Sequence, residues 1–182
     1  SVNLAAMEEV EKKRLREEFL NAQISDLVQT KEELLQMIEQ LSQESLKLFQ
    51  ETFSLVRQNF RKNFAILFQG GEADLQLIEA SSNPLAAGVE IIAQPPGKQM
   101  RSITLLSGGE KCLTSLALLF AIFEVKASPF CILDEIDAPL DDTNIDRFVK
   151  MVRHFAQQSQ FLIITHNKRT MAESDKIFGV SM

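Results

Sequence analysis

One stretch decides the fold, and it reads Phe130-Cys131-Ile132-Leu133-Asp134-Glu135. A short apolar run is typical of a strand buried in a parallel sheet, and ligands of open α/β sheets bind at the carboxyl edge of such strands. At that edge Asp134 is suited to hold Mg²⁺ through water, and Glu135 is suited to polarise an attacking water. The alternative is that the two acids end an exposed strand without a chemical role.

A second apolar run, residues 161–164, ends in Thr165 and His166. The segment between the two runs has the length of a crossover helix, so the two strands are expected to be parallel. His166 should then lie at the same sheet edge as Asp134 and Glu135, where it could sense a γ-phosphate. A lone histidine is more often structural. Asp141 or Asp142 is the expected N-cap of the crossover helix, whose apolar residues are Ile145, Phe148, Val149, Val152 and Phe155.

Upstream, Ser107-Gly108-Gly109-Glu110 has the pattern of a helix start. Ser107 followed by Glu110 three residues later predicts a capping box, and this structural role alone accounts for both residues. It does not account for two glycines in the first turn, which cost about 1 kcal/mol each relative to alanine. Glycines at a helix N-terminus let a phosphate reach the backbone N–H groups. We therefore predict phosphate binding here, on a helix with apolar residues Leu113, Leu116, Ala117, Phe120 and Phe123.

The first third of the chain reads as one long helix, because residues 2–68 contain neither Pro nor Gly. Residues 20–48 carry a heptad seam, typical of a coiled coil that needs a partner strand. Two weak positions interrupt the seam, which comprises Leu20, Ile24, Leu27, Lys31, Leu34, Ile38, Leu41, Ser45 and Leu48. A second stripe at near-helical spacing predicts docking onto the chain's own globular part: Phe49, Phe53, Val56, Phe60, Phe64 and Leu67.

Gly70-Gly71 should end this helix, and a small β section follows. Residues 73–77 and 89–93 read as strands, with turns expected at Asn83-Pro84 and at residues 95–97. From Leu105 onward, strands alternate with helices, which is typical of an α/β layer with a mainly parallel sheet and flanking helices. The expected organisation is residues 1–48 as a coiled-coil neck and residues 49–182 as one globular lobe. That lobe divides into residues 49–68, 72–104 and 105–182.

Composition is that of a soluble globular protein, with 182 residues, 45% apolar and 24% charged. No apolar run reaches the ~18 residues of a membrane span, and no signal peptide is recognisable. Residues 1–4 lead directly into helical sequence, so we expect the chain to begin within a longer protein. Cys112 and Cys131 are expected to be small buried apolar residues in a reducing cytoplasm. The net charge of −6 does not favour non-specific DNA binding. Any contact with DNA would come from a local patch, another chain or a missing part.

The order of these motifs resembles the core of an ABC-type ATPase, with a signature motif, a Walker B strand, a D-loop and an H-loop. The D-loop is Ala138-Pro139-Leu140-Asp141. Finer details are similar to bacterial structural maintenance of chromosomes (SMC) proteins, and Glu110 stands where transporters usually have Gln. The similar stretches are residues 2–6, 88–98, 105–111, 134–142, 165–171 and 179–182. The departures from the family are small. Cys112 stands where the family often has Ala, and Ala172 and Ser174 replace the usual residues after the H-loop. The sequence ends at Met182, where relatives usually continue for a further strand.

The sequence has no G-x-x-x-x-G-K-[ST] phosphate loop. Gly97-Lys98 is only a partial match, because Ile92 replaces the first glycine and Gln99 offers no hydroxyl for Mg²⁺. In the SMC family this loop lies in an N-terminal lobe, separated by a long coiled coil with a hinge. The resemblance therefore implies the C-terminal lobe of a P-loop NTPase-like head, unable to hydrolyse ATP alone, whose neck pairs with the descending helix of the N-terminal lobe.

The resemblance also implies a mechanism with ATP and Mg²⁺ as cofactors. Asp134, Glu135 and His166 would serve the nucleotide held by the same polypeptide's phosphate loop. Ser107 and Gly109, with Asp141 of the D-loop, would complete the site of a second head in a homodimer. The expected nucleotide-binding residues of this group also include Gly108 and Glu110. A kleisin subunit would bridge the dimer at the neck and outer lobe. The assembly would entrap DNA or extrude loops, for chromosome condensation and segregation at the bacterial nucleoid in the cytoplasm, with no membrane involved.

Three other readings are weaker. An ABC-type DNA break-repair ATPase shares the motifs and the split architecture, but Pro139 and residues 91–98 favour SMC. A transporter subunit would carry its phosphate loop in one compact domain without a starting coiled coil. A non-enzymatic adaptor that uses only the neck helix would have no use for Glu135 next to Asp134.

Overall fold

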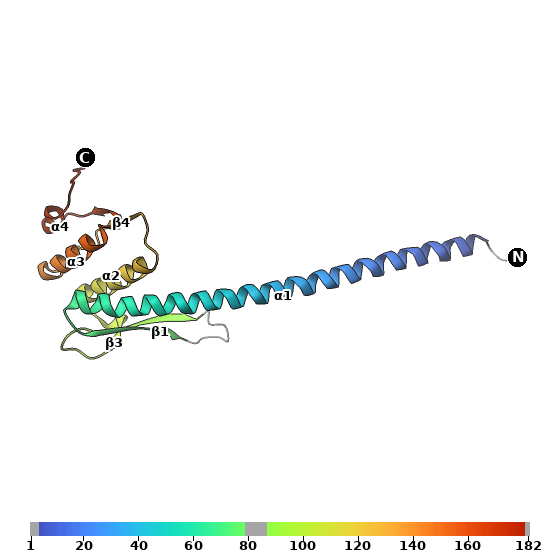
Figure 1. Cartoon of the computed structure of the whole chain (residues 1–182), viewed down its shortest axis with the longest axis horizontal. Coiled ribbons are helices and arrows are strands. Elements are labelled where there is room, and N and C mark those ends of the chain that lie inside the picture. The colour runs from blue at the N-terminus through green and yellow to red at the C-terminus, as the bar shows by residue number, and fades with distance from the viewer. Residues whose placement is uncertain (1–3, 79–86, 181–182) are drawn as a thin grey trace. The chain divides into compact units, whose positions relative to one another are not determined.

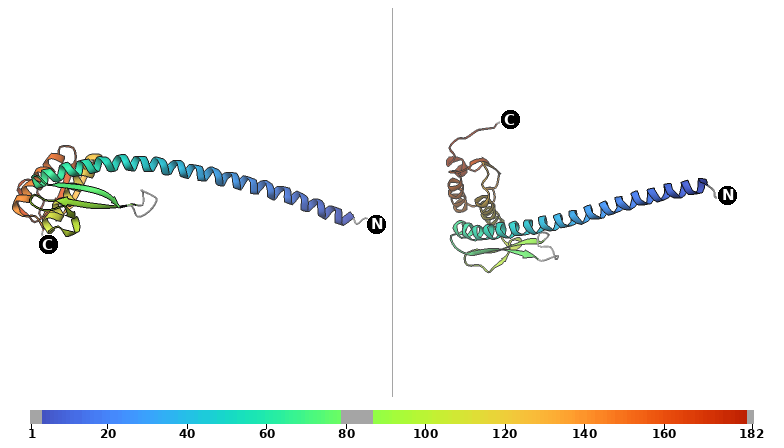
Figure 2. Two further views of the ribbon diagram at one scale, coloured as in Figure 1. Left: turned by 90° about the horizontal axis from the view of Figure 1, so that it is seen from below. Right: turned by 45° about the vertical axis from the view of Figure 1, so that its right-hand side comes forward.

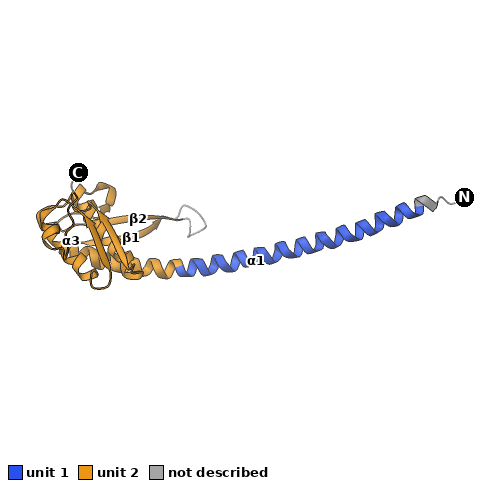
Figure 3. Ribbon diagram, turned by 90° about the horizontal axis from the view of Figure 1, so that it is seen from above, with its two compact units in different colours: residues 1–48 blue, residues 49–182 orange. Residues whose placement is uncertain are grey.

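The computed structural model describes residues 4–78 and 87–180, with side chains from Met7 onward. The predicted turn at Asn83-Pro84 lies outside the described residues. The chain divides into two compact units, residues 1–48 and residues 49–182, which Figure 3 shows in different colours. Helix α1 (Leu4–Phe68) supplies all the described structure of the first unit and the first element of the second. None of the helices described here is long and apolar enough to cross a membrane.

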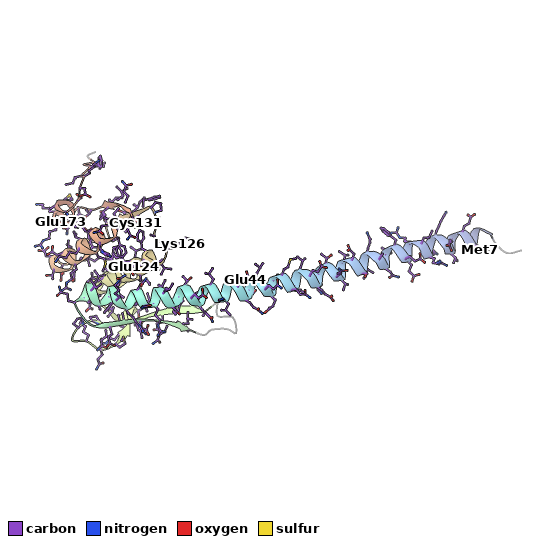
Figure 4. The ribbon with its side chains drawn as sticks, viewed as in Figure 1. Met7, Glu44, Glu124, Lys126, Cys131 and Glu173 are labelled. Atoms are coloured by element: carbon purple, nitrogen blue, oxygen red, sulfur yellow. The ribbon has the colours of Figure 1, made fainter. Side chains whose placement is uncertain are left out.

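In the first unit, the apolar side chains of the heptad seam are exposed to solvent, Leu27, Leu34, Ile38 and Leu41 among them. Figure 4 shows the side chains of this part of α1 projecting from a single helix. Ion pairs between neighbouring turns, Lys13 with Glu9 at 3.1 Å and Arg14 with Glu18 at 3.3 Å, contribute only a few tenths of a kcal/mol each. Such pairs do not offset a row of exposed leucines, so this helix has the surface of an unpaired coiled-coil strand.

The end of α1 belongs to the core of the second unit, as predicted. Phe60, Phe64 and Leu67 are fully buried, and the Phe64 ring stacks on Phe68 with 4.1 Å between ring centroids. The helix stops where Gln69, Gly70 and Gly71 take φ values of 57°, 130° and 77°. A Cβ atom on Gly71 would lie 2.3 Å from the carbonyl oxygen of Gln94, so only glycine fits there.

The first sheet is antiparallel in the order β1-β2-β3 and comprises β1 (Glu72–Ile78), β2 (Gly88–Gln94) and β3 (Arg101–Ser102). The two predicted strands are confirmed, and Ala73 pairs with Ala93; the two-residue β3 was not predicted. Arg57 and Arg61 of α1 bond the Asp74 carboxylate of β1. The Arg57 hydrogen bond is the main reason that the pKa of Asp74 lies far below its usual range.

The second sheet is parallel and joins β4 (Phe130–Asp134) to β5 (Gln160–Ile164), with Asp134 opposite Ile164. The predicted parallel pairing is therefore confirmed. The crossover between them contains α3 (Asp142–Phe155), and α2 (Gly108–Val125) precedes β4. A short 3₁₀ turn, Ile103–Leu105, leads into α2, and α4 (Lys168–Ala172) follows β5. Figures 1 and 2 show the elements from three directions.

The prediction that both parallel strands are buried is wrong for one face of this sheet. On that face the side chains are half exposed or more, namely Phe130 at 60%, Ile132 at 57%, Leu162 at 55% and Ile164 at 50%. The other face packs on the core, where Phe161 contacts Phe120 and Phe123 of α2. The three antiparallel strands all belong to the small β section expected over residues 72–104, and the strands described after Leu105, β4 and β5, form the parallel sheet expected there.

The two cysteines are half-buried and free rather than fully buried as expected. The Cys112 thiol of α2 donates to the carbonyl oxygen of Ile136 at 3.0 Å, and Cys131, labelled in Figure 4, lies on β4. Burial raises the pKa of both thiols. Both are therefore protonated and unreactive near neutral pH.

Candidate functional site

The carboxyl edge of the parallel sheet brings Glu135 and His166 together. The Glu135 N–H donates to the Ile164 carbonyl at 2.9 Å, one residue beyond the β4–β5 ladder. Glu135 has φ 47°, a left-handed conformation that is uncommon for a residue with a side chain. Its Oε1 atom lies 4.0 Å from Nδ1 of His166, and both side chains are exposed. The predicted convergence of these two residues is thus confirmed in geometry.

Asp134 is the last residue of β4, and its carboxylate is exposed at the same edge. Among the described residues, no three or more His, Cys, Asp or Glu side chains are grouped so that they could hold a metal ion. Mg²⁺ is commonly bound by one or two carboxylates together with nucleotide phosphates and water. Asp134 therefore fits a magnesium ligand that acts with a nucleotide, and does not fit an all-protein magnesium site.

Asp137 has a part in this region that the sequence did not reveal. Its side chain is 1% exposed, and its Oδ2 atom accepts hydrogen bonds from Thr165 at 2.7 Å and from Thr170 of α4. Its Oδ1 atom has no hydrogen-bond partner among the residues described in the structure. The three residues tie the loop after β4 to the loop that carries His166. The sequence showed only one of several nearby acids, and nothing in its spacing distinguished the buried one.

Ser107 caps α2 at its N-terminus, and the predicted capping box with Glu110 is confirmed. The Glu110 Oε2 atom accepts from the Ser107 N–H at 3.1 Å and from its hydroxyl at 2.9 Å. A Cβ atom on Gly109 would lie 3.2 Å from the Pro139 carbonyl oxygen, whereas one on Gly108 would meet open space. Close approach of the D-loop is therefore a structural reason for glycine at position 109, beside the phosphate binding predicted from the sequence.

Glu110 has a second partner from another element. The Nζ atom of Lys98, in the turn after β2, lies 2.8 Å from Glu110 Oε1. The Lys98 hydrogen bond is the main reason that the pKa of Glu110 lies below its usual value, while partial burial acts in the opposite direction. The carboxylate at the start of α2 is thus ionised and paired.

Asp141 is the N-cap of α3, because its carboxylate accepts from the Asn144 N–H at 2.8 Å. This resolves the choice between Asp141 and Asp142, since Asp142 instead pairs with Arg169 of α4 at 3.1 Å. Arg169 also pairs with Asp146 at 3.1 Å. Asp141 therefore has a structural role in capping, besides any role toward a ligand.

The predicted site residues fall into two groups. Asp134, Glu135 and His166 share the sheet edge, whereas the α2 start and Asp141 are joined through the D-loop, where Gly109 approaches Pro139. Within the described residues, no hydrogen bond or ion pair links Ser107 or Glu110 to the sheet-edge group. The described contacts therefore join the residues within each group and not across the two groups.

Comparison with known proteins defines the class. The chain matches the family model of the RecF/RecN/SMC N terminal domain over residues 4–182, and it therefore belongs to that family. It is 47% identical over 182 residues to the chromosome partition protein Smc of Rhodopirellula baltica, covering 100% of this chain and 15% of that protein. The family description names an N-terminal domain, so this match does not support the predicted origin in the C-terminal half of the parent protein.

Similar solved structures are SMC proteins and head domains, so they agree with this class and share the head fold. One similar chain, from work on ATP-driven dimerization and DNA-stimulated activation of SMC ATPases, is 44% identical with a TM-score of 0.67; the match covers 75% of this chain and 82% of that chain. Another is the SmcHead bound to the C-winged helix domain of ScpA, 44% identical with a TM-score of 0.71, covering 77% of this chain and 43% of that one.

Proposed function

We propose that this chain is the signature-bearing lobe of a chromosome-partition ATPase head of the SMC type, and that it comes from the C-terminal half of its parent protein. The assignment rests on motif content. The chain has the Ser107–Glu110 signature, the Walker B acids, the D-loop and the H-loop, and it has no phosphate loop in its 182 residues. It spans about 15% of the length of its relative, so a phosphate loop has room elsewhere.

The observation that carries the proposal is the open face of the β4–β5 sheet. Parallel sheets are covered on both faces in nearly all proteins, but here Phe130, Ile132, Leu162 and Ile164 are half exposed or more. Complete burial of a fully exposed side chain of this kind contributes roughly 1.5–3 kcal/mol, and because these four are 50–60% exposed, about half of that remains to be gained at each. A second lobe that covers these residues and adds the phosphate loop would complete both the sheet and the nucleotide site.

Within one head, Asp134, Glu135 and His166 would face the nucleotide held by the phosphate loop. Mg²⁺, when bound, would supply positive charge that offsets the charge developing on the phosphates. Asp134 would hold the ion through water, Glu135 would orient and polarise the attacking water, and His166 would contact the γ-phosphate. The 4.0 Å separation of Glu135 and His166 lets both reach one water or phosphate oxygen at hydrogen-bonding distance.

A second head would supply the other half of each site. In that arrangement the start of α2, with Asp141 of the D-loop, meets the γ-phosphate bound by the partner head, so that two heads enclose two ATP molecules. The absence of a bond between the two half-sites in the described residues supports this division. A similar chain comes from work on ATP-driven dimerization of SMC ATPases, which also supports it.

The neck and the end of the chain would bind further partners. The exposed seam of residues 20–48 would pair with the descending helix of the other lobe. A similar head binds the C-winged helix domain of ScpA, and we assign a kleisin of this kind to the neck and outer lobe. DNA would be entrapped or extruded by the whole bacterial complex in the cytoplasm, since a chain of net charge −6 offers little attraction of its own.

The test is ATP turnover by the chain alone and by the chain with the phosphate-loop lobe. Alone, it should bind ATP negligibly and hydrolyse none. Co-expressed with that lobe, it should form a one-to-one complex with Mg²⁺-dependent ATPase activity. Replacing both Phe130 and Leu162 with Asp should prevent the complex, whereas replacing the exposed Gln157 and Gln158 with Asp should not. Steady turnover by the chain alone, abolished by Glu135→Gln, would overturn the proposal.

A further inference from the structure

Lys98 is the last residue of a tight turn whose backbone conformation is constrained. The Lys98 N–H donates to the Pro95 carbonyl at 3.0 Å, and Gly97 has φ 76°. Pro96 and Gly97 thus occupy the two central positions of a type II turn, where proline and a residue of positive φ are preferred. The Pro96 ring packs beside Gly71, where an added Cβ would lie 3.2 Å from the Pro96 Cδ atom. The backbone position of Lys98 is therefore fixed by its neighbours.

Lys98 and Ser107 bind opposite oxygens of one carboxylate. Lys98 Nζ lies 2.8 Å from Glu110 Oε1, and Oε2 accepts from the N–H and the hydroxyl of Ser107. The Glu110 side chain is 18% exposed and that of Lys98 is 56% exposed. A partly exposed ion pair contributes little to folding stability, so stability alone is a weak reason for this pair.

The start of α2 presents an electrostatic conflict. Backbone N–H groups and the helix dipole attract an anion to this end, but the Glu110 carboxylate lies within hydrogen-bonding distance of the residue that would meet it. An uncompensated carboxylate repels a phosphate over this range, and the repulsion is strong where water is excluded. Lys98 is the cation that cancels the carboxylate charge at this point.

We propose that Lys98 is a positioning residue of the signature motif: it neutralises Glu110 and holds it against Ser107, so that the start of α2 can accept the γ-phosphate on a partner head. This inference rests on the proposed function, in which Lys98 would prepare the signature motif for the partner's phosphate. Gly97-Lys98 matches only part of the phosphate-loop pattern in sequence. In this proposal Lys98 lies beside the phosphate that the other head binds.

The test uses heads completed with the phosphate-loop lobe, in a Glu135→Gln background that retains ATP, with dimerisation measured by analytical ultracentrifugation. Lys98→Met should weaken ATP-dependent dimerisation about tenfold or more. ATP affinity of the separate heads and the thermal unfolding midpoint should stay unchanged. Lys98→Arg, which keeps the charge, should dimerise as the parent does. Lys126→Met removes a cation from the opposite end of α2, marked in Figure 4, and is the matched control.

The deciding variant is Lys98→Met combined with Glu110→Gln. If the lysine acts by neutralising the carboxylate, removing the carboxylate charge should restore most of the lost dimerisation. If Lys98→Met instead weakened dimerisation through a folding defect, the second substitution would not restore it. Parental dimerisation by Lys98→Met, or a double variant as weak as Lys98→Met, would overturn the inference. Ser107→Arg separates the two ideas, because dimerisation by that variant would instead overturn the trans role of the signature motif.

Discussion

Glu135 and His166 lie side by side at the carboxyl edge of the β4–β5 sheet, with 4.0 Å between Oε1 and Nδ1. The pairing arises from parallel register, because Asp134 lies opposite Ile164 and each strand delivers its next residues to the same edge. Glu135 takes φ 47° there, and its N–H still bonds the Ile164 carbonyl. Residues held in sparsely populated conformations cluster at functional sites, and this one is held by the adjoining strand.

The left-handed backbone of Glu135 leads to a stability prediction. Glycine carries no Cβ penalty at positive φ, whereas glutamine carries the same penalty as glutamate, about 1 kcal/mol. We expect the Glu135→Gly chain to be more stable than the Glu135→Gln chain by about 0.5–1 kcal/mol, although both lose the carboxylate. Urea unfolding followed by circular dichroism measures the difference. Equal midpoints for the two variants would argue against the strained conformation.

Asp137 should matter to both stability and activity. Asp137→Ala leaves the hydroxyls of Thr165 and Thr170 without their buried acceptor, and we expect a loss of about 2–4 kcal/mol in the free energy of unfolding. In the completed head, ATP hydrolysis should also fall, because the loop that carries His166 loses its tie to the loop after β4. Asp175→Ala, at an exposed position, should change stability by less than about 0.5 kcal/mol. Similar stability for the two variants would remove the structural role given to Asp137.

The Asp74 carboxylate predicts an acid-sensitive contact between α1 and β1. Its folded pKa is depressed, mainly by the Arg57 hydrogen bond, so its stabilisation is fully present above the unfolded pKa of about 3.9 and is lost as pH falls through the folded pKa. Asp74→Asn should cost about 1–3 kcal/mol at pH 7. The difference from the parent should shrink below about pH 4. Unfolding curves at pH 7 and pH 3 measure it, and a constant difference would refute the linkage.

The neck seam should pair with a helix of the other lobe. Replacing Leu34 and Ile38 with Asp puts two charges into that interface, and co-purification of the two lobes should fall. Gln36→Asp with Gln40→Asp, at outer positions of the same heptads, is the matched control. Equal recovery of both double variants would mean that the seam does not form this interface.

Much of the fold was predictable, since apolar spacing and turn residues determine elements locally. The helix end at Gly70, the strands β1 and β2, and the caps at Ser107 and Asp141 follow from such signals. The open sheet face was not predictable from Ile132 and Leu162. A continuous apolar run indicates burial on both faces, but it does not indicate that the covering layer comes from residues outside the chain.

Parts of the candidate site could not be predicted from the sequence and are visible only in the fold. From the sequence, glycine at position 109 was explained by the predicted approach of a phosphate to the backbone. The structure adds a second reason, the close approach of the Pro139 carbonyl oxygen. Asp137 and Lys98 were indistinguishable in sequence from nearby exposed charges. Their partners, Thr165 and Glu110, are distant along the chain, and only folding brings each pair together.

The most direct test of the central claim compares two variants of the completed head in the presence of ATP and Mg²⁺. Glu135→Gln keeps the shape of the side chain but removes the base, so heads should bind ATP, close and stay closed. Ser107→Arg places a bulky cation at the start of α2, so each head should bind ATP but remain single. Both should lose hydrolysis by about 100-fold or more. Size-exclusion chromatography should show dimers for Glu135→Gln and monomers for Ser107→Arg; closed dimers of Ser107→Arg, or identical behaviour of the two, would contradict the account.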